Sequence, residues 1–198
     1  MRYLIYDCEI IKCIPDRDGT RFDDYEYCDG WSDHANMGIS CVGFAASNGD
    51  VCVCRWDDPG DKAWGLSLLN NADIIVGFNS RRFDDALMAA NGVAVSTAYD
   101  LLEQVRIAAY DSPDWEDQPP GCSYALGAIG EANGFPKTGS GVLAPQLWQQ
   151  GKHQEVIDYC LNDVKITKAL LDLGLKGELI DPNTSQKLQL RPLDNGEG

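Results

Sequence analysis

The order of strand-like and helix-like segments predicts an α/β protein with a mixed five-stranded sheet and helices on its faces. Two apolar runs, residues 39–46 and 50–56, surround Ser-Asn-Gly-Asp and predict a β-hairpin. A short apolar strand at 72–78 then lies between two helical patterns, as in a βαβ unit. With 198 residues, the chain is long enough for one domain with a full hydrophobic core.

Local patterns justify each element in turn. The chain opens with a strand at residues 3–8, and residues 11–38 are polar and acidic, which indicates a long loop. The first helix follows Asp57-Asp58-Pro59, a sequence typical of a helix start. The remaining expected elements are helix 60–70, strand 72–78, helix 81–91, strand 98–101, and helices 101–109, 123–134 and 152–174.

The end of the chain shows a different pattern. Residues 178–191 indicate a hairpin around Asp-Pro-Asn-Thr, and the sequence after Pro192 is expected to be loose. We therefore expect one domain over residues 1–176, with 11–38 as an acidic insertion loop. A C-terminal hairpin and flexible tail would occupy residues 177–198.

The net charge is −15, from 31 acidic and 16 basic residues. This balance argues against a broad basic groove for nucleic acid. It does not exclude a nuclease, because bound divalent metal ions can supply positive charge locally. The acidic excess is uneven along the chain: residues 15–38 hold seven acids and two bases, and residues 111–120 hold four acids and no base.

Membrane and secretion signals are not expected. No apolar run approaches the roughly 18 residues that span a bilayer, and Asp7 lies where a signal peptide needs an apolar core. We expect a cytoplasmic protein, or one in the host cytoplasm if the source is viral. The eight cysteines are then expected to be reduced and mostly buried in the core.

The first strand carries two carboxylates, Asp7 and Glu9. Residues two apart on a strand point to the same face, so together these side chains can offer oxygen ligands to hard cations. A frayed strand end with both carboxylates in solvent is the simpler interpretation. Burial of the two charges would require a partner for them.

A second acidic pair, Asp84 and Asp85, follows the strand at 72–78. Asn79 or Ser80 can cap the helix that begins after it, and the helix dipole already favours acids in its first turn. Successive helical residues point about 100° apart, so only one of the two carboxylates can face a site at the strand end.

The long helix at 152–174 carries Tyr159 and Asp163 at i and i+4, hence on one face. They flank its apolar stripe rather than oppose it, which places Asp163 toward the sheet edge. A polar surface stripe is the simpler alternative. A carboxylate at the sheet edge would favour a cation beside it.

Taken in order, these three segments resemble the motifs of the DEDD 3′–5′ exonucleases, which share the ribonuclease H-like fold with polymerase proofreading domains and ribonuclease D. The resemblance runs from about residue 3 to 172. Tyr99-Asp100-Leu101-Leu102 and the stretch from Leu126 to Lys137 are similar to the family's intervening segments. A tyrosine four residues before Asp163 resembles the tyrosine subclass (DEDDy), and Ile10 departs from the Thr or Ser of many relatives.

The resemblance implies roles for individual residues. Asp7, Glu9, Asp84 and Asp163 would bind two Mg²⁺ or Mn²⁺ ions, and Tyr159 would orient the attacking water in a two-metal-ion hydrolysis. Asp85 is left out, because the family pattern places its acid directly after Phe83. Four residues are candidates for lining the substrate, with structural or solvated roles as the alternative: Asn79, Phe83, Arg81 and Arg82.

The implied activity is 3′–5′ exonuclease cleavage of single-stranded DNA or RNA, releasing nucleoside monophosphates. The partners would be a single-stranded 3′ end and, as a further candidate, a replication or repair protein. An inactive ribonuclease H-like nucleic-acid-binding or scaffold module is the alternative, and a structural Ca²⁺-binding protein is disfavoured because no EF-hand loop is present. Cys13, Cys28 and His34 could bind zinc, but their spacing fits no familiar pattern.

Overall fold

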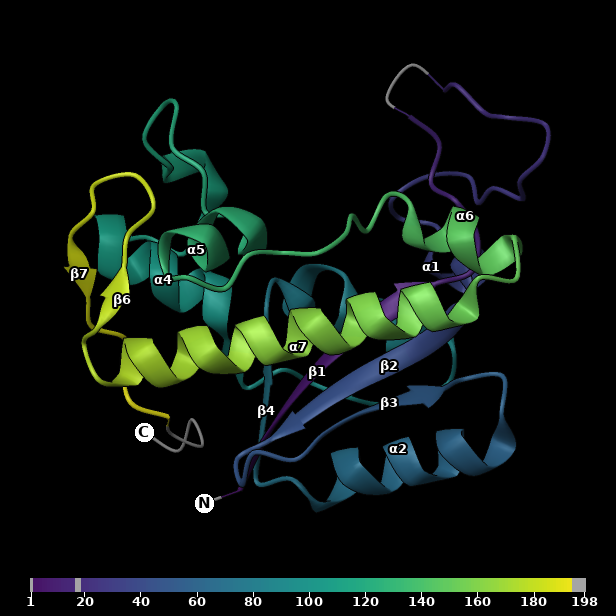
Figure 1. Cartoon of the computed structure of the whole chain (residues 1–198), viewed down its shortest axis with the longest axis horizontal. Coiled ribbons are helices and arrows are strands. Elements are labelled where there is room, and N and C mark those ends of the chain that lie inside the picture. The colour runs from purple at the N-terminus through teal and green to yellow at the C-terminus, as the bar shows by residue number, and fades with distance from the viewer. Residues whose placement is uncertain (1, 17–18, 194–198) are drawn as a thin grey trace.

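The computed structural model describes residues 2–16 and 19–193 and places a five-stranded sheet between helices (Figure 1). The strand order is β3-β2-β1-β4-β5. Strand β2 is antiparallel to β1 and β3, whereas β4 is parallel to β1 and β5 to β4. The predicted mixed α/β sheet is therefore confirmed. Its strands are β1 Tyr3–Ile10, β2 Ile39–Ala46, β3 Val51–Arg55, β4 Ile74–Gly77 and β5 Tyr99–Asp100.

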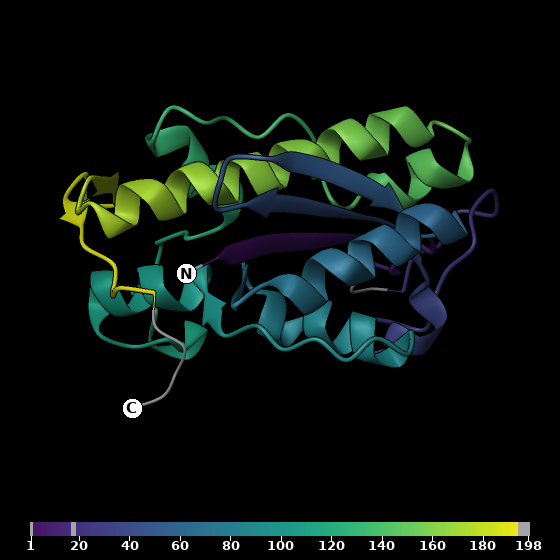
Figure 2. The same cartoon turned by 90° about the horizontal axis from the view of Figure 1, so that it is seen from below.

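Helices cover both faces of this sheet. The long helix α7 (His153–Leu175) and helix α2 (Pro59–Asn71) lie on opposite sides of it (Figure 2). Strand β1 is buried on both faces, because Ile5 packs in the core that includes α7 while Leu4 and Tyr6 pack in the other core. Helix α3 (Asp84–Ala90) joins that second core.

The remaining elements pack around α7. Helices α4 (Leu101–Tyr110) and α5 (Leu126–Ala132) contribute to its core cluster. Strands β6 (Leu179–Ile180) and β7 (Lys187–Leu188) pair antiparallel, so the expected hairpin is present. Of the expected flexible tail, residues 194–198 lie outside the described residues.

Three local expectations were wrong. Residues 11–38 hold a short helix, α1 (His34–Met37), and helix α6 (Ala144–Gln149) was not predicted. The expected helix 81–91 is split into a 3-10 turn, η1 (Ser80–Arg82), and α3, because Phe83 between them has non-helical dihedral angles (φ −130°, ψ −66°). A second 3-10 turn, η2 (Trp115–Asp117), lies within the acidic stretch at 111–120.

Two further expectations concern the state of the cysteines and the absence of membrane-spanning helices. All eight cysteines are free thiols, and six of them are buried, as small apolar side chains are. Within the described ranges, no helix has both the length and the apolar character needed to cross a bilayer.

Helix α7 lies close to β2 at Gly43, which is the register partner of Asp7 on β1. A Cβ atom at this position would lie 2.8 Å from Cys160 Sγ and 3.0 Å from Val164 Cγ1. Glycine therefore sets the spacing between the sheet and the helix that carries Tyr159 and Asp163.

Replacing Gly43 with alanine is expected to destabilise the protein by about 1–3 kcal/mol, because the added methyl group overpacks this contact. Urea unfolding monitored by circular dichroism measures the change. Gly127→Ala in α5 is the matched control, since its added Cβ would approach no atom closer than 3.8 Å. Equal stability of the two variants would contradict the tight packing at Gly43.

Candidate active site

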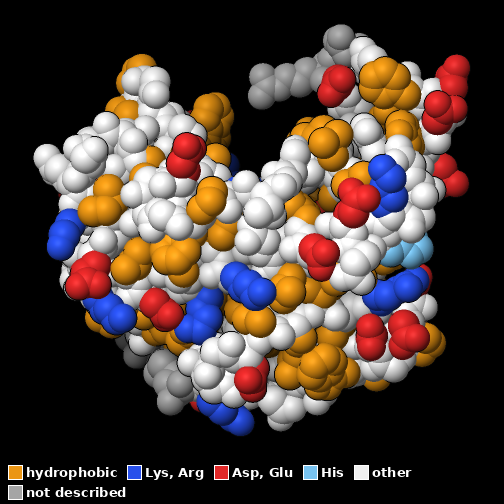
Figure 3. All heavy atoms as spheres, viewed as in Figure 1, with side chains coloured by type: hydrophobic (Ala, Val, Ile, Leu, Met, Phe, Trp, Pro, Cys, Tyr) orange, Lys and Arg blue, Asp and Glu red, His pale blue; other side chains and the backbone are white. Residues whose placement is uncertain are grey.

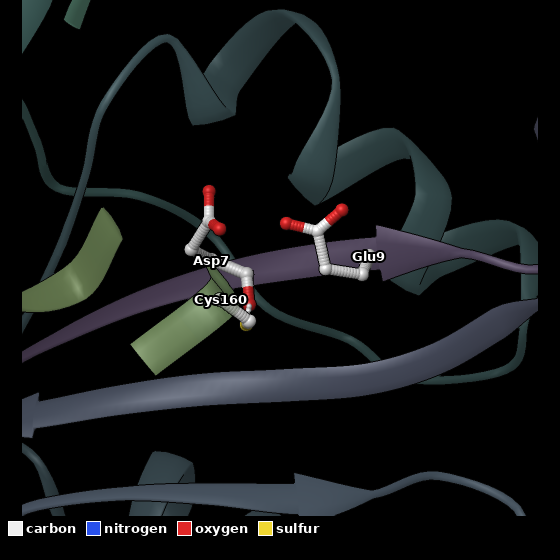
Figure 4. Close-up of side chains that lie close together, drawn as sticks. All are labelled: Asp7, Glu9 and Cys160. Carbon is white, nitrogen blue, oxygen red and sulfur yellow. Dashed lines mark hydrogen bonds between the residues drawn. The ribbon is translucent and has the colours of Figure 1, made fainter. Parts of the chain in front are cut away.

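The end of β1 presents two carboxylates on the face that is covered by α7. Asp7 and Glu9 point to the same side of the strand, and Cys160 of α7 lies beside them (Figure 4). One ligand atom from each of these three residues lies within 4.8 Å of the others. Glu9 is buried, and Asp7 is partly exposed. The simpler interpretation of a frayed strand end is therefore wrong.

Cys160 supports this strand rather than offering a charged ligand. Its thiol donates to the backbone oxygen of Asp7 over 3.7 Å. The hydrogen bond with the Cys41 thiol, together with burial, raises the pKa of Cys160 well above its usual range. A neutral thiol is a poor ligand for a hard cation, so of the three groups only the two carboxylates suit such an ion.

Asp84 reaches the same strand from the other core. The last β1–β4 register pair is Ile5 with Val76, and three residues further along β1 the backbone N–H of Cys8 donates to Asp84 Oδ1 over 3.0 Å. The first turn of α3 thereby replaces β4 as the neighbour of β1. Burial raises the pKa of Asp84 to about 7.

The neighbouring acid, Asp85, has a structural role. Its carboxylate accepts hydrogen bonds from the Tyr6 hydroxyl, from the backbone N–H of Thr97 over 2.9 Å and from the Thr97 hydroxyl over 2.8 Å. As expected for successive helical residues, Asp84 and Asp85 face different surroundings. Asp85 is satisfied by its partners, which agrees with leaving it out of the site.

Helix α7 supplies the third segment. Tyr159 and Asp163 are both buried, and Asp163 is 3% exposed. Lys137 Nζ lies 2.7 Å from Asp163 Oδ2 and 4.9 Å from the centroid of the Tyr159 ring. Asp163 Oδ1 is buried and has no hydrogen-bond partner within the part of the chain that the structure describes. This second oxygen is free to bind a cation.

The position of Lys137 was not predicted as part of the site. The resemblance placed it in a Gly-x-x-Lys loop at the end of the segment from Leu126 to Lys137, without giving it a role in the site. That loop also covers Tyr159, because a Cβ at Gly139 would lie 2.5 Å from the tyrosine ring, and one at Gly141 would lie 3.3 Å from its hydroxyl. A cavity of about 450 Å³ adjoins the ring on the side of α6.

The four carboxylates act on one another electrostatically. Burial and the charges of Asp84 and Asp163 raise the pKa of Asp7 well above its usual range, and burial and the charge of Asp7 do the same for Glu9. Burial also raises the pKa of Asp163, while the Lys137 ammonium opposes that shift. Divalent cations would relieve this concentration of negative charge, and oxygen donors are the ligands that Mg²⁺ and Mn²⁺ prefer. The residues therefore fit such a site.

The predicted substrate-lining residues lie around the turn before α3. Asn79 adopts a left-handed conformation (φ 60°), which asparagine tolerates, and its backbone N–H donates to Asp100. The expected capping hydrogen bond from Asn79 or Ser80 is absent from the described residues.

The two arginines of this turn differ in their partners. The Arg81 guanidinium donates to the carbonyl oxygens of Thr97 and Ala98 and pairs with Glu103, so it holds the turn in place. Arg82 is more exposed and lies 3.5 Å from Asp114. Of the two, Arg82 is the better placed to reach a phosphate.

The proposed zinc ligands do not come together. The Cys28 thiol donates to the backbone oxygen of Cys13, and the His34 ring packs against Phe83. Over residues 2–16 and 19–193, the only group of three or more potential metal ligands close enough for one ion is Asp7, Glu9 and Cys160.

Comparison with known proteins identifies the fold. The sequence matches no protein family and no curated protein. Its structure matches the family B DNA polymerase from the hyperthermophilic archaeon Pyrobaculum calidifontis, with a TM-score of 0.56 and 16% identity, over 91% of this chain and 26% of the polymerase chain. An "ExoI/SSB-Ct complex" matches with a TM-score of 0.44 and 16% identity, over 86% of this chain and 43% of that chain.

This chain thus spans about a quarter of the polymerase chain that it matches. The likeness to the polymerase, together with the sheet topology, confirms the predicted ribonuclease H-like α/β fold. At this level of identity, the likeness concerns the fold alone.

The buried carboxylates predict how stability depends on pH. The folded-state pKa of Asp84, raised from 3.8 to about 7, means that the folded protein binds more protons than the unfolded chain between these values. Stability without metal should therefore fall as pH rises through this range, by up to about 1.4 kcal/mol per pH unit for one proton. Asp84→Asn, which keeps an acceptor for the Cys8 amide, should show a shallower fall.

Thermal unfolding in EDTA at several pH values between about 5 and 8 measures this dependence. Asp73→Asn is the control, because Asp73 pairs with Arg2 on the surface and its pKa is lowered, not raised. The raised pKa of Asp84 would be contradicted if the stability of the wild-type protein rose with pH over this range and Asp84→Asn showed the same dependence.

Proposed function

We propose that this protein is a metal-dependent 3′–5′ exonuclease that hydrolyses phosphodiester bonds of single-stranded DNA or RNA. One observation carries the proposal. Asp84, at the start of α3, and Asp163, in the middle of α7, both lie close enough to Asp7 of β1 to act on its charge, and Asp7, Glu9 and Asp163 act on the buried Tyr159. Along the chain, 75 and 154 residues separate Asp84 and Asp163 from Glu9. Their order and spacing also match the motifs of the DEDD exonucleases, and the ribonuclease H-like fold is consistent with that activity.

Each carboxylate has a place in the proposed reaction. Asp7 and Glu9 would bind cations from β1, while Asp84 and Asp163 would bind them from the two flanking segments. Bound at these oxygens, two Mg²⁺ or Mn²⁺ ions would supply the charge that activates a water and stabilises the leaving oxygen. Lys137 adds a fixed positive charge beside Asp163, where a substrate phosphate would otherwise meet only carboxylates.

Tyr159 is proposed to orient the attacking water through its hydroxyl group. Burial and the nearby charges of Glu9 and Asp163 raise the pKa of Tyr159, so the hydroxyl stays protonated and can donate a hydrogen bond. A group that keeps its proton does not serve as the general base. Its contribution would be to position the water, with the Gly139–Gly141 loop packed against its ring.

The substrate would be a single-stranded 3′ end, which releases nucleoside monophosphates. Asn79, Phe83 and Arg82 lie near the start of α3 and are proposed to contact it, with Arg81 holding their turn through Thr97 and Ala98. A replication or repair protein is proposed as a further partner. The excess of acidic residues favours one alternative, a ribonuclease H-like module that does not cleave nucleic acid.

Incubation with 5′-labelled single strands of DNA and of RNA, in Mg²⁺, Mn²⁺ or EDTA, tests the activity. We expect a ladder that shortens from the 3′ end with either metal and no cleavage in EDTA. Asp163→Ala should lower the rate by at least about 100-fold, since a metal-binding carboxylate is lost. Asp158→Ala, an exposed acid on the same helix, is the matched control. A folded wild-type protein that cleaves neither strand with metal would favour the inactive module.

Tyr159→Phe tests the role of the hydroxyl group separately from metal binding. The phenyl ring keeps the contacts with Gly139 and Lys137, so only the hydroxyl group and its hydrogen bonds, including that with Asp163, are lost. We expect cleavage to slow by about 10- to 100-fold, while Mn²⁺ affinity, measured by calorimetry, stays unchanged. An unaltered rate would reject the proposed role of Tyr159.

A further inference from the structure

Trp31, in the 11–38 segment, is a large exposed side chain held next to the candidate active site. Its side chain is 67% exposed, and its ring meets the Phe83 ring edge to face, with centroids 5.9 Å apart. His34 packs against the same phenylalanine at 5.6 Å. Phe83 directly precedes Asp84, so these ring contacts fix the insertion against the acidic site.

A pocket of about 210 Å³ lies between the insertion and the segment before α6. Two of its residues connect it to the carboxylates. Ile10 follows Glu9 on β1, and Gly141 lies against the Tyr159 hydroxyl. The part of the chain near the insertion and the part near α5 stand apart with a hollow between them, and hydrophobic side chains are exposed on both sides (Figure 3). The apolar lining of the pocket is Ile10, Ile14, Pro15, Trp31, Val142 and Pro145.

The chemistry of this lining suits a nucleobase better than a phosphate. Its one charged residue is Asp16, a carboxylate, which would repel an anion. Val142, like Trp31, is 67% exposed, so apolar groups border the pocket on two sides. A flat aromatic base can stack on an indole ring and place its edges toward water, and such stacking tolerates any base.

We propose that Trp31 stacks on a base at the 3′ end of the single strand, so that the 11–38 segment forms part of the substrate-binding site. This inference rests on the proposed function, since it takes the occupant of the pocket to be the substrate of the adjoining carboxylates. Trp31 binds and positions the strand and takes no part in the chemical step. Through Trp31, the 11–38 segment would increase the affinity of the protein for single-stranded 3′ ends.

Fluorescence anisotropy of a 5′-labelled oligonucleotide of about ten nucleotides tests the stacking. Ca²⁺ replaces Mg²⁺ during binding, so that the carboxylates are neutralised. Trp31→Ala should weaken binding by about tenfold, and Trp31→Phe should restore most of the loss, because it keeps an aromatic face. Trp64→Ala is the matched control, since Trp64 is 51% exposed on α2, across the sheet from α7.

A second oligonucleotide, abasic at its last two 3′ positions, separates stacking from folding. Wild type and Trp31→Ala should bind this probe equally. Equal affinity of the two proteins for the intact strand, or the same loss on both probes, would overturn the proposal. Cleavage with Mg²⁺ is scored independently. If Trp31→Ala weakens binding but the protein does not cleave, the base-stacking site is supported and the proposed nuclease activity is rejected. If the protein cleaves but Trp31→Ala binds as wild type does, the nuclease activity is supported and the stacking site is rejected.

Discussion

The hydrogen bond from the Cys8 amide to Asp84 is the interaction on which the arrangement of the candidate site depends. Strand β4 pairs with β1 only as far as Ile5, so among the described residues no strand pairs with the rest of that edge of β1. The Asp84 carboxylate accepts a hydrogen bond from the backbone N–H of Cys8 on this edge. This bond holds Asp84 beside the strand that carries Asp7 and Glu9. The early end of β4 thus creates the space in which the acidic segments meet.

The acids of this region divide into two kinds. Asp85 and Asp100 each accept several hydrogen bonds and hold turns together, so their charges are compensated within the fold. Asp7, Glu9 and Asp163 lie close together with little positive charge nearby, and the raised pKa of Asp163 is opposed by Lys137 and by the Tyr159 hydroxyl. Uncompensated charge lowers stability, which is commonly the cost of a functional site. The distinction rests on hydrogen-bond partners, which neighbouring acids in a sequence do not reveal.

Much of the architecture follows from the sequence, because apolar periodicity and turn residues determine it locally. The hairpin at Asn48-Gly49 and the start of α2 at Pro59 are examples. The break at Phe83 was not predicted, and the ring of this residue contacts Trp31 and His34, which are distant in sequence and lie outside any local pattern. Helix α6 was missed because its six residues are too few to show a clear period.

The same reasoning applies to the candidate site. Asp7, Glu9, Asp84, Tyr159 and Asp163 were selected from strand and helix spacing combined with the resemblance to the exonuclease motifs. The structure brings Asp84 to β1 and Tyr159 and Asp163 close to Asp7 and Glu9, and their role as a site stays a prediction. Lys137 and Trp31 belong to loops, whose paths depend on packing between distant segments. Their positions beside Asp163 and Phe83 became visible only in three dimensions.

The β6–β7 hairpin has a consequence for the far end of α7. The backbone N–H of Leu190 donates to the Gly174 carbonyl over 2.9 Å, and its side chain occupies the space that a Cβ at Gly174 would need. Gly174 and Asp163 are eleven residues apart on one rigid helix, or about 16 Å along its axis. The contacts of Leu190 with Gly174 therefore help to fix the C-terminal end of α7 and, through this rigid helix, the position of the candidate metal ligand Asp163. A chain shortened to residue 176 would lose these contacts.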